Sequence, residues 1–249
     1  MAEILDNGAS VGAPEEIRSA TRRGANRLWH FLLTNATAFD FAEYSRFSVH
    51  QAISEADINA VVDLRSRKYG STLRDLEPED LAPNTELFLV RAPDGRPLAS
   101  IRFSFDLFGD GLLKADKLTD IPNTWRLRLD GKPARLSEGI RFCNAGRSKK
   151  EQLYAKLQLW VKVFWRSQDL GVDWLLALAR EPLNGDYRRM YYQSPGSGPH
   201  WVVPADYPTP HELLALKVQD PTIPWIQPEH WLHRVSTERP NVQILCDAT

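Results

Sequence analysis

A short segment near the middle of the chain gathers the residue types best suited to chemistry. It reads Arg135-Leu-Ser-Glu138-Gly-Ile-Arg141-Phe142-Cys-Asn144-Ala-Gly146-Arg147-Ser148-Lys149-Lys150. Its first half alternates like a β-strand, which places Glu138 and Arg141 on opposite faces unless Gly139 bulges the strand and brings them together. A glycine inside a strand marks either a bulge or the close approach of a ligand. The segment is therefore the first candidate for a binding site.

The turn after this strand predicts an anion site at the start of the following helix. A helix N-terminus offers unpaired backbone N–H groups and the positive end of the helix dipole. Lysines in the first turn are unfavourable for the helix alone, but they are suited to a bound phosphate. The residues predicted to hold a phosphate-bearing group are Asn144, Gly146, Arg147, Ser148, Lys149 and Lys150.

The wider stretch 126–150 is also basic. It carries eight basic residues against the two acids Asp130 and Glu138. Such a run is typical of a solvated face, and it is equally suited to docking a phosphate or an acidic protein.

The elements that position this segment predict an α/β fold with a mixed sheet. The segment 134–180 has the pattern of a strand, a long amphipathic helix (148–170) and a second, nearly continuous apolar strand, which predicts a parallel βαβ crossover. Two earlier strands joined at Asp94-Gly95 predict an antiparallel hairpin. The further expected elements are a strand from Phe47, a helix capped by Ser54 and ending near Tyr69, a helix near 184–193 and a strand at 213–218.

The predicted domain organisation is one leader and one domain. Residues 1–44 read as a leader and a helix, with helical periodicity from 15 to 33, and residues 45–249 as a single domain. Within that domain, 106–133 is predicted to be a long, partly ordered insertion, and the chain after 197 to be a Pro-rich extension. Long loops inside compact domains are often functional.

Composition excludes several classes of protein. The 249 residues are 43% hydrophobic and 25% charged, with a net charge of −1, which gives no general attraction to nucleic acid. The sequence shows no secretory signal and no apolar run of roughly 18 residues, and Cys143 and Cys246 are too few for a disulfide framework. A cytoplasmic protein without a transmembrane segment is expected, and contact with a membrane surface is left open. No P-loop or G-x-S-x-G motif occurs, and His230 and His233 lack the H-E-x-x-H pattern of a metal site.

Four motifs, in order over residues 45–196, resemble a known family. They are Leu64-Arg65-Ser-Arg67-Lys-Tyr69, the acidic stretch Asp75-Leu-Glu-Pro-Glu79-Asp80, the strand Pro97-Leu-Ala-Ser-Ile-Arg102-Phe, and Glu138-Gly-Ile-Arg141-Phe142. Together they resemble the GNAT-type acyltransferases, in the branch of N-acyl amino acid synthases and acyl-homoserine-lactone synthases. The resemblance implies a GNAT-like fold, a central mixed sheet flanked by helices. It also implies an N-acyltransferase that moves a fatty acyl group from a phosphopantetheine thioester to a small amine, with an amino acid as the expected acceptor.

The resemblance also assigns roles to residues. Glu138 is the expected proton acceptor, and a salt bridge to Arg141 or Arg102 is the alternative for it. Tyr192 is the expected proton donor to the leaving thiolate, although Tyr187 or Tyr191 can take that place. Arg141 completes the predicted catalytic set. Arg65 and Arg102 are expected to clamp a substrate carboxylate, or else to pair with the acids of 75–80. The predicted substrate contacts are Arg65, Tyr69, Arg102 and Phe142.

The donor is the least defined part of this interpretation. The R/Q-x-x-G-x-G/A phosphate loop of CoA-dependent relatives is absent, and Asn144-Ala-Gly146-Arg147 only approximates it. An acidic acyl carrier protein is therefore the expected partner, with CoA as the alternative, and neither a tightly bound cofactor nor a metal is expected. The competing functions are a CoA-dependent acetyltransferase of another amine and a catalytically silent module that binds a protein through 126–150.

Overall fold

The computed structural model describes residues 40–70, 75–196, 198–203, 209–220 and 223. All of them belong to one compact unit, residues 40–249. The helix predicted at 15–33, the histidines at 230 and 233, Cys246 and most of the Pro-rich extension lie outside the described residues.

Seven strands form one mixed sheet in the order β1-β2-β3-β4-β5-β7-β6. Their bounds are β1 Ser48–Gln51, β2 Thr85–Arg91, β3 Pro97–Asp106, β4 Leu136–Asn144, β5 Trp174–Ala179, β6 Trp201–Val202 and β7 His211–Lys217. Of the pairings within this sheet, β4 with β5 is parallel and the others are antiparallel. The predicted mixed sheet, hairpin and crossover are confirmed.

The helices described here are α2 Phe41–Tyr44, α3 Glu55–Tyr69, the 3-10 helix η3 Pro78–Leu81, α4 Lys114–Leu118, α5 Asn123–Arg126, α6 Lys149–Asp169 and α7 Leu183–Arg189. Three of them, α2, α3 and α6, begin at a side chain that caps them. The Ser54 side chain accepts from the Asp57 amide, and the Ser148 side chain accepts from the Glu151 amide. Helix α7 ends earlier than predicted because Tyr191 turns the chain with a left-handed φ of 67°. None of the described helices is long and apolar enough to cross a membrane.

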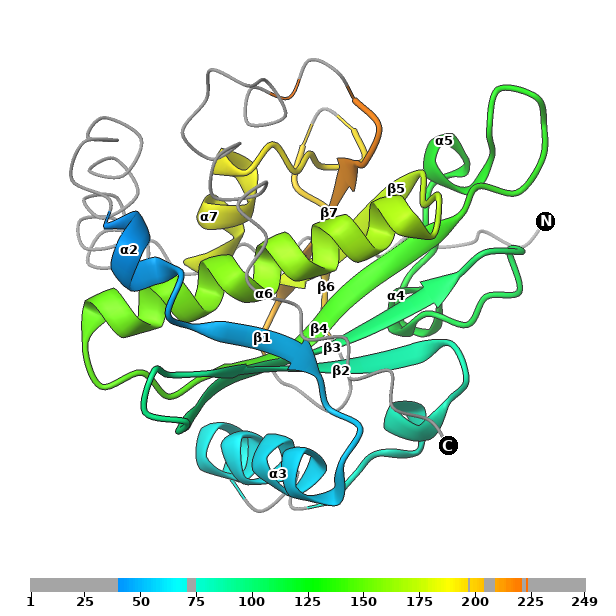
Figure 1. Cartoon of the computed structure of the whole chain (residues 1–249). Helices are drawn as coiled ribbons and strands as arrows, with labels where there is room; N and C mark the ends of the chain where they lie inside the picture. Colours follow the sequence, from blue (N-terminus) through cyan, green and yellow to red (C-terminus); the bar gives the residue numbers. More distant parts are fainter. Residues whose placement is uncertain (1–39, 71–74, 197, 204–208, 221–222, 224–249) are drawn as a thin grey trace, which may run out of the picture. The chain divides into compact units, whose positions relative to one another are not determined.

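Helices α3 and α6 cover opposite faces of the sheet (Figure 1). On the α6 face, the Ser137 hydroxyl hydrogen-bonds the Ser167 hydroxyl at 3.0 Å. Gly139 follows on the same face, where an added Cβ would lie 3.1 Å from Ile101 Cδ1 and 3.9 Å from Val163 Cγ1. Gly139 therefore allows β4 to pack closely, and its neighbour Glu138 faces the other side.

The segment 106–133 contains two short helices and contributes to the core. The helices are α4 and α5, and four apolar side chains of the segment are buried in a cluster with residues of β4, β5 and β7: Leu113, Ala115, Ile121 and Trp125. At its start, the Asp106 carboxylate accepts the backbone amides of five consecutive residues, 108 to 112. Burial alone would raise the pKa of Asp106, but these amide bonds outweigh it and hold the pKa below its usual value. The insertion is therefore attached to the domain by the buried Asp106 at its start and by apolar side chains that pack against β4, β5 and β7.

Candidate active site

Strands β4 and β5 separate partway along their length. Their parallel pairing covers only Leu136–Glu138 against Trp174–Leu176. Beyond that point β4 continues to Asn144 beside β3, and β5 continues to Ala179 beside β7. The facing edges of the two strands thus lose their ladder partner in the middle of the sheet. A ligand with amide groups can pair with such backbone edges, as an added strand does.

Strand β4 bulges where it leaves β5. Ser100 lies opposite Cys143 and Arg102 opposite Ile140, so two residues of β4, Arg141 and Phe142, face the single residue Ile101. Arg141 has a left-handed φ of 56°, an unusual conformation for a residue with a side chain. A bulge re-aims side chains. It lies two residues beyond Gly139, so the predicted position of the bulge is wrong, and Glu138 and Arg141 are not brought into contact with each other by it.

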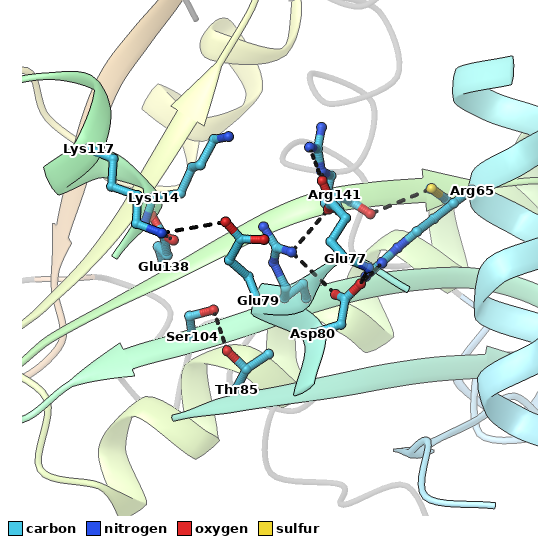
Figure 2. A network of polar contacts seen from close by, with 12 residues as sticks. Arg65, Glu77, Glu79, Asp80, Thr85, Ser104, Lys114, Lys117, Glu138 and Arg141 are labelled. Carbon is cyan, nitrogen blue, oxygen red and sulfur yellow. Dashed lines mark hydrogen bonds and ion pairs between the residues drawn. The ribbon is translucent and has the colours of Figure 1, made fainter. Parts of the chain in front are cut away.

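Three arginines and two acids form one connected group on the α3 face, here called the arginine network: Arg65, Arg102, Arg141, Glu77 and Asp80 (Figure 2). Arg141 holds Glu77 with two bonds of 2.8 and 2.5 Å. Arg102 Nη1 bridges Glu77 at 3.0 Å and Asp80 at 3.3 Å, and Arg65 Nη1 donates to Asp80 at 2.6 Å. Burial alone would raise the pKa of Asp80, but the Arg65 and Arg102 guanidinium groups outweigh it and lower the pKa.

The arginine network joins three guanidinium groups to two carboxylates, and the charge of Arg102 also acts on the carboxylates of Glu79 and Glu138. The side chains of Arg65 and Arg102 are 0% and 1% exposed, so their charges are largely hidden from water. Nε and Nη2 of Arg65 and Nε of Arg102 are buried without a hydrogen-bond partner among the described residues. Buried donors without partners are rare in proteins. The accessible edge is formed by Arg141 and Glu77, which are 15% and 20% exposed.

Ion pairing with the acids of 75–80, one of the two expectations for Arg65 and Arg102, is therefore present. The pair between Glu77 and Arg141 was not predicted. Glu77 lies 64 positions before Arg141 in the sequence, so only the fold brings the two together. The available signal was local: Glu77 begins η3 with a capping box in which Asp80 accepts the Glu77 amide at 2.8 Å.

Glu138 is completely buried under the insertion. Its carboxylate accepts the amides of Lys114 at 2.6 Å and Ala115 at 3.0 Å, the first two residues of α4. The expected salt bridge to Arg141 is replaced by the Glu77–Arg141 pair, and no direct bond joins Glu138 to Arg102 within the described residues. Burial raises the pKa of Glu138, and the two amide bonds offset this only in part. In this structure the carboxylate holds α4 against the sheet.

Tyr192 lies between α6 and α7. It is 5% exposed, and its ring packs edge-on against Tyr187 at 5.0 Å between centroids. The chain just after it, at Gln193, bridges to Ala215 of β7. Burial raises the pKa of Tyr192 well above its usual value, with the Trp160 side chain beside it partly opposing the shift. The phenol is therefore protonated at neutral pH, the form that can donate to a thiolate. Tyr191, the alternative, is 45% exposed.

The turn from β4 into α6 is closed by its own side chains. Asn144 Nδ2 donates to the Gln152 carbonyl at 2.7 Å, and Gln152 Nε2 donates to the Gly146 carbonyl at 2.8 Å. A Cβ on Gly146 would lie 2.7 Å from the Gln152 backbone nitrogen, so only glycine fits. Gly146 and Asn144 thus have a structural role in the turn, which does not depend on a ligand.

The predicted cations at this turn lie on the surface, and they differ in the acidic residues near them. Lys150 pairs with Glu43, and it is 3.7 Å from Asp40. The Arg147 amide donates to Glu151 at 2.6 Å, and Glu151 also pairs with Arg96 at 2.8 Å. Lys149 is exposed at the first position of α6. The structure therefore brings the predicted phosphate contacts to one helix start, where Glu151 already supplies a negative charge.

Two predicted substrate contacts meet on β4. The Tyr69 hydroxyl at the end of α3 donates to the Phe142 carbonyl at 3.0 Å. This bond joins α3 to the bulged part of β4, next to Arg141. Tyr69 thus has a clear structural role, and both residues lie at the edge of the arginine network.

Comparison with known proteins identifies the fold. No family model and no curated protein matches this sequence. Among solved structures, FeeM, an N-acyl amino acid synthase from uncultured soil microbes, matches with a TM-score of 0.57 and 13% identity, over 70% of this chain and 91% of FeeM. The AHL synthase LasI matches with a TM-score of 0.51 and 13% identity, over 70% of this chain and 90% of LasI. The chain therefore has the GNAT acyltransferase fold, and the predicted resemblance is confirmed at that level.

Proposed function

We propose that this protein is an N-acyltransferase that moves a fatty acyl group from a phosphopantetheine thioester to the amine of an amino acid. The observation that carries the proposal is the separation of β4 from β5 beside an arginine network whose accessible edge is formed by Arg141 and Glu77. The first feature suits an extended, amide-bearing donor arm. The second suits an acceptor that carries a carboxylate.

In this proposal the acceptor carboxylate binds at the accessible edge of the arginine network. Arg141 is the group that meets it, since its guanidinium is partly exposed and aimed by the bulge. Arg65 and Arg102 supply the buried positive charge behind it. A carboxylate there would accept charge-assisted hydrogen bonds from the Arg141 guanidinium.

Transfer requires a neutral amine, a stabilised oxyanion and a protonated leaving thiolate. The nitrogen attacks the thioester carbonyl, the C–S bond breaks, and the amine loses a proton while the sulfur gains one. Tyr192 is the proposed donor to sulfur, because burial keeps its phenol protonated. Glu138 remains the proposed proton acceptor, and it can act only after its carboxylate is released from the amides of Lys114 and Ala115.

The acceptor is tested by release of free thiol from acyl-CoA and from acyl carrier protein. Each amino acid is compared with the amino alcohol that lacks its carboxylate. We expect turnover with amino acids and little with the alcohols, and Arg141→Ala should raise the KM for the amino acid about 10- to 100-fold, the range for a hydrogen bond to a charged group. Arg67→Ala, an exposed arginine on α3, is the matched control. Equal turnover of acid and alcohol would remove the proposed carboxylate site.

The donor is tested at the start of α6. Lys149→Glu with Lys150→Glu should raise the KM for the donor and leave the melting temperature unchanged, whereas Arg67→Glu with Lys68→Glu should change neither. If the donor is acyl carrier protein, the rate should also fall with added salt, because the Debye length shrinks from about 10 Å at 0.1 M to about 3 Å at 1 M. Salt-independent turnover of acyl-CoA at the same rate would favour the CoA-dependent alternative.

A further inference from the structure

Two neighbouring loops of the insertion expose large apolar side chains. Phe108 is 76% exposed and Leu129 is fully exposed, at 112%, while Leu112 and Leu127 are each 49% exposed. The loops touch, since a Cβ on Gly109 would lie 2.9 Å from Pro133 Cβ. Together they form an apolar tip, defined here as residues 107–112 and 127–133. The acyl-transfer proposal assigns this tip no role.

The second loop of the apolar tip is a rigid hairpin turn. Arg128 N donates to the Lys132 carbonyl at 2.9 Å, and Gly131 N donates to the Arg128 carbonyl at 2.9 Å. Gly131 has a φ of 78°, as a three-residue hairpin loop with a terminal glycine requires. Leu129 is thereby held outward at the turn, and Figure 1 shows this hairpin beside α5, extending away from the sheet.

The backbone of the apolar tip is largely satisfied from within. In the hairpin the amides of residues 127, 128, 131 and 132 are paired, and in the first loop the amides of residues 108–112 all bond to Asp106. An unpaired amide costs several kcal/mol where water is scarce. Loops whose amides are already paired can enter a water-poor layer without that penalty.

Cations lie in and beside the hairpin of the apolar tip. The tip itself carries Arg128 and Lys132 together with the acids Asp110 and Asp130, and Arg126 and Arg135 flank the hairpin in the sequence. Arg128 and Lys132 are 43% and 74% exposed, and their acidic partners lie at 3.5 Å on the surface. Such exposed pairs are weak, so both cations remain free to exchange partners. Their long side chains can reach past the apolar residues to a negatively charged layer.

We propose that the apolar tip binds the surface of an anionic lipid bilayer. Phe108 and Leu129 enter the region between headgroups and acyl chains, while Arg128 and Lys132 contact lipid phosphates. A bilayer suits this tip better than a folded protein does, because the apolar side chains are convex and separate, and a fluid layer closes around them without a preformed pocket. The proposal does not depend on acyl transfer.

The test is co-sedimentation of the full chain with two kinds of vesicle, phosphatidylcholine alone and phosphatidylcholine mixed with phosphatidylglycerol. We expect binding to the mixed vesicles that weakens as salt rises. Each cation near an anionic surface contributes about fivefold in partition coefficient, so Arg128→Glu with Lys132→Glu should reduce binding by at least about 25-fold. Leu129→Ser should reduce it by about tenfold, the low end for burial of one leucine.

Two matched control variants distinguish vesicle binding through the apolar tip from nonspecific adsorption. Ile53→Ser removes an apolar side chain that is 75% exposed between β1 and α3, and Arg67→Glu with Lys68→Glu reverses two exposed cations on α3. Both should leave vesicle binding unchanged. Absence of binding by the unaltered protein, or equal losses in tip and control variants, would overturn the proposal. So would tip variants that bind vesicles normally but slow transfer from acyl carrier protein, since the occupant would then be an acidic protein.

Discussion

The substitution Asp106→Asn tests how the insertion is held. The Asp106 side chain accepts three amides on Oδ1, from Phe108 at 3.2 Å, Gly109 at 2.8 Å and Asp110 at 3.0 Å. It accepts two on Oδ2, including that of Gly111 at 2.9 Å. Asparagine keeps one acceptor oxygen, so the best arrangement retains three bonds and places an NH₂ group against the other two amides. Hydrogen bonds to charged groups contribute roughly 1.5–3 kcal/mol each.

The loss of one well-formed bond and the weakening of the others predict a decrease of about 2–4 kcal/mol in the free energy of unfolding at pH 7. The sign of the pH dependence follows from the lowered pKa of Asp106. Its stabilisation is fully present above the unfolded pKa of about 3.9 and is lost as the pH falls through the folded pKa. The difference between the two proteins should therefore shrink in acid.

The assay is urea denaturation at pH 7 and at a series of lower pH values, followed by intrinsic tryptophan fluorescence. Asp110→Asn is the matched control, because it removes an exposed carboxylate from the same loop. It should change the midpoint little. A midpoint for Asp106→Asn equal to that of the control, or a difference that persists unchanged in acid, would refute the reasoning.

Three further outcomes are expected. Arg141→Lys keeps the charge but loses the two-point contact with Glu77, so it should weaken acceptor binding while shifting the melting temperature little; wild-type KM would contradict this. Glu138→Ala leaves two amides of α4 without an acceptor, so it should lower the free energy of unfolding by about 2–5 kcal/mol and speed limited proteolysis of the insertion. Unchanged proteolysis would show that another group holds α4. Cys143 is buried, and burial raises its pKa to about 11, so peptide mass spectrometry should find it alkylated only after unfolding; labelling in the native protein at pH 8 would argue against this burial.

The crossover from β4 through α6 to β5 could be predicted because its information is local. A 3.6-residue apolar period, the Ser148 cap and a continuous apolar strand each lie within a few residues of the feature they specify. The same holds for α3 and its Ser54 cap. The separation of β4 from β5 left no comparable signal, because pairing stops without any change in strand pattern.

The candidate site could be predicted in residue type, but its ion pairs could be predicted only in part. Arg65, Arg102 and Arg141 were selected from the sequence, yet Glu77 joins them only through the fold. Glu138 was predicted to face a substrate or an arginine. Its partners are backbone amides of α4, which carry no side-chain signal in the sequence. The helices α4 and α5 within the insertion were not predicted, since its apolar residues are too widely spaced to show a helical or strand period.

The central claim is tested most directly by mass spectrometry of the reaction product. The purified full chain is incubated with a fatty acyl-CoA or a fatty acyl carrier protein and a mixture of amino acids, and the reaction is repeated with Arg141→Ala and Arg67→Ala. The account predicts a mass equal to an amino acid plus the acyl group, formed by the unaltered protein and by Arg67→Ala and strongly reduced with Arg141→Ala. No acylated amino acid with either donor, from a protein that is folded by its melting curve, would contradict the account and favour a catalytically silent module of the GNAT fold.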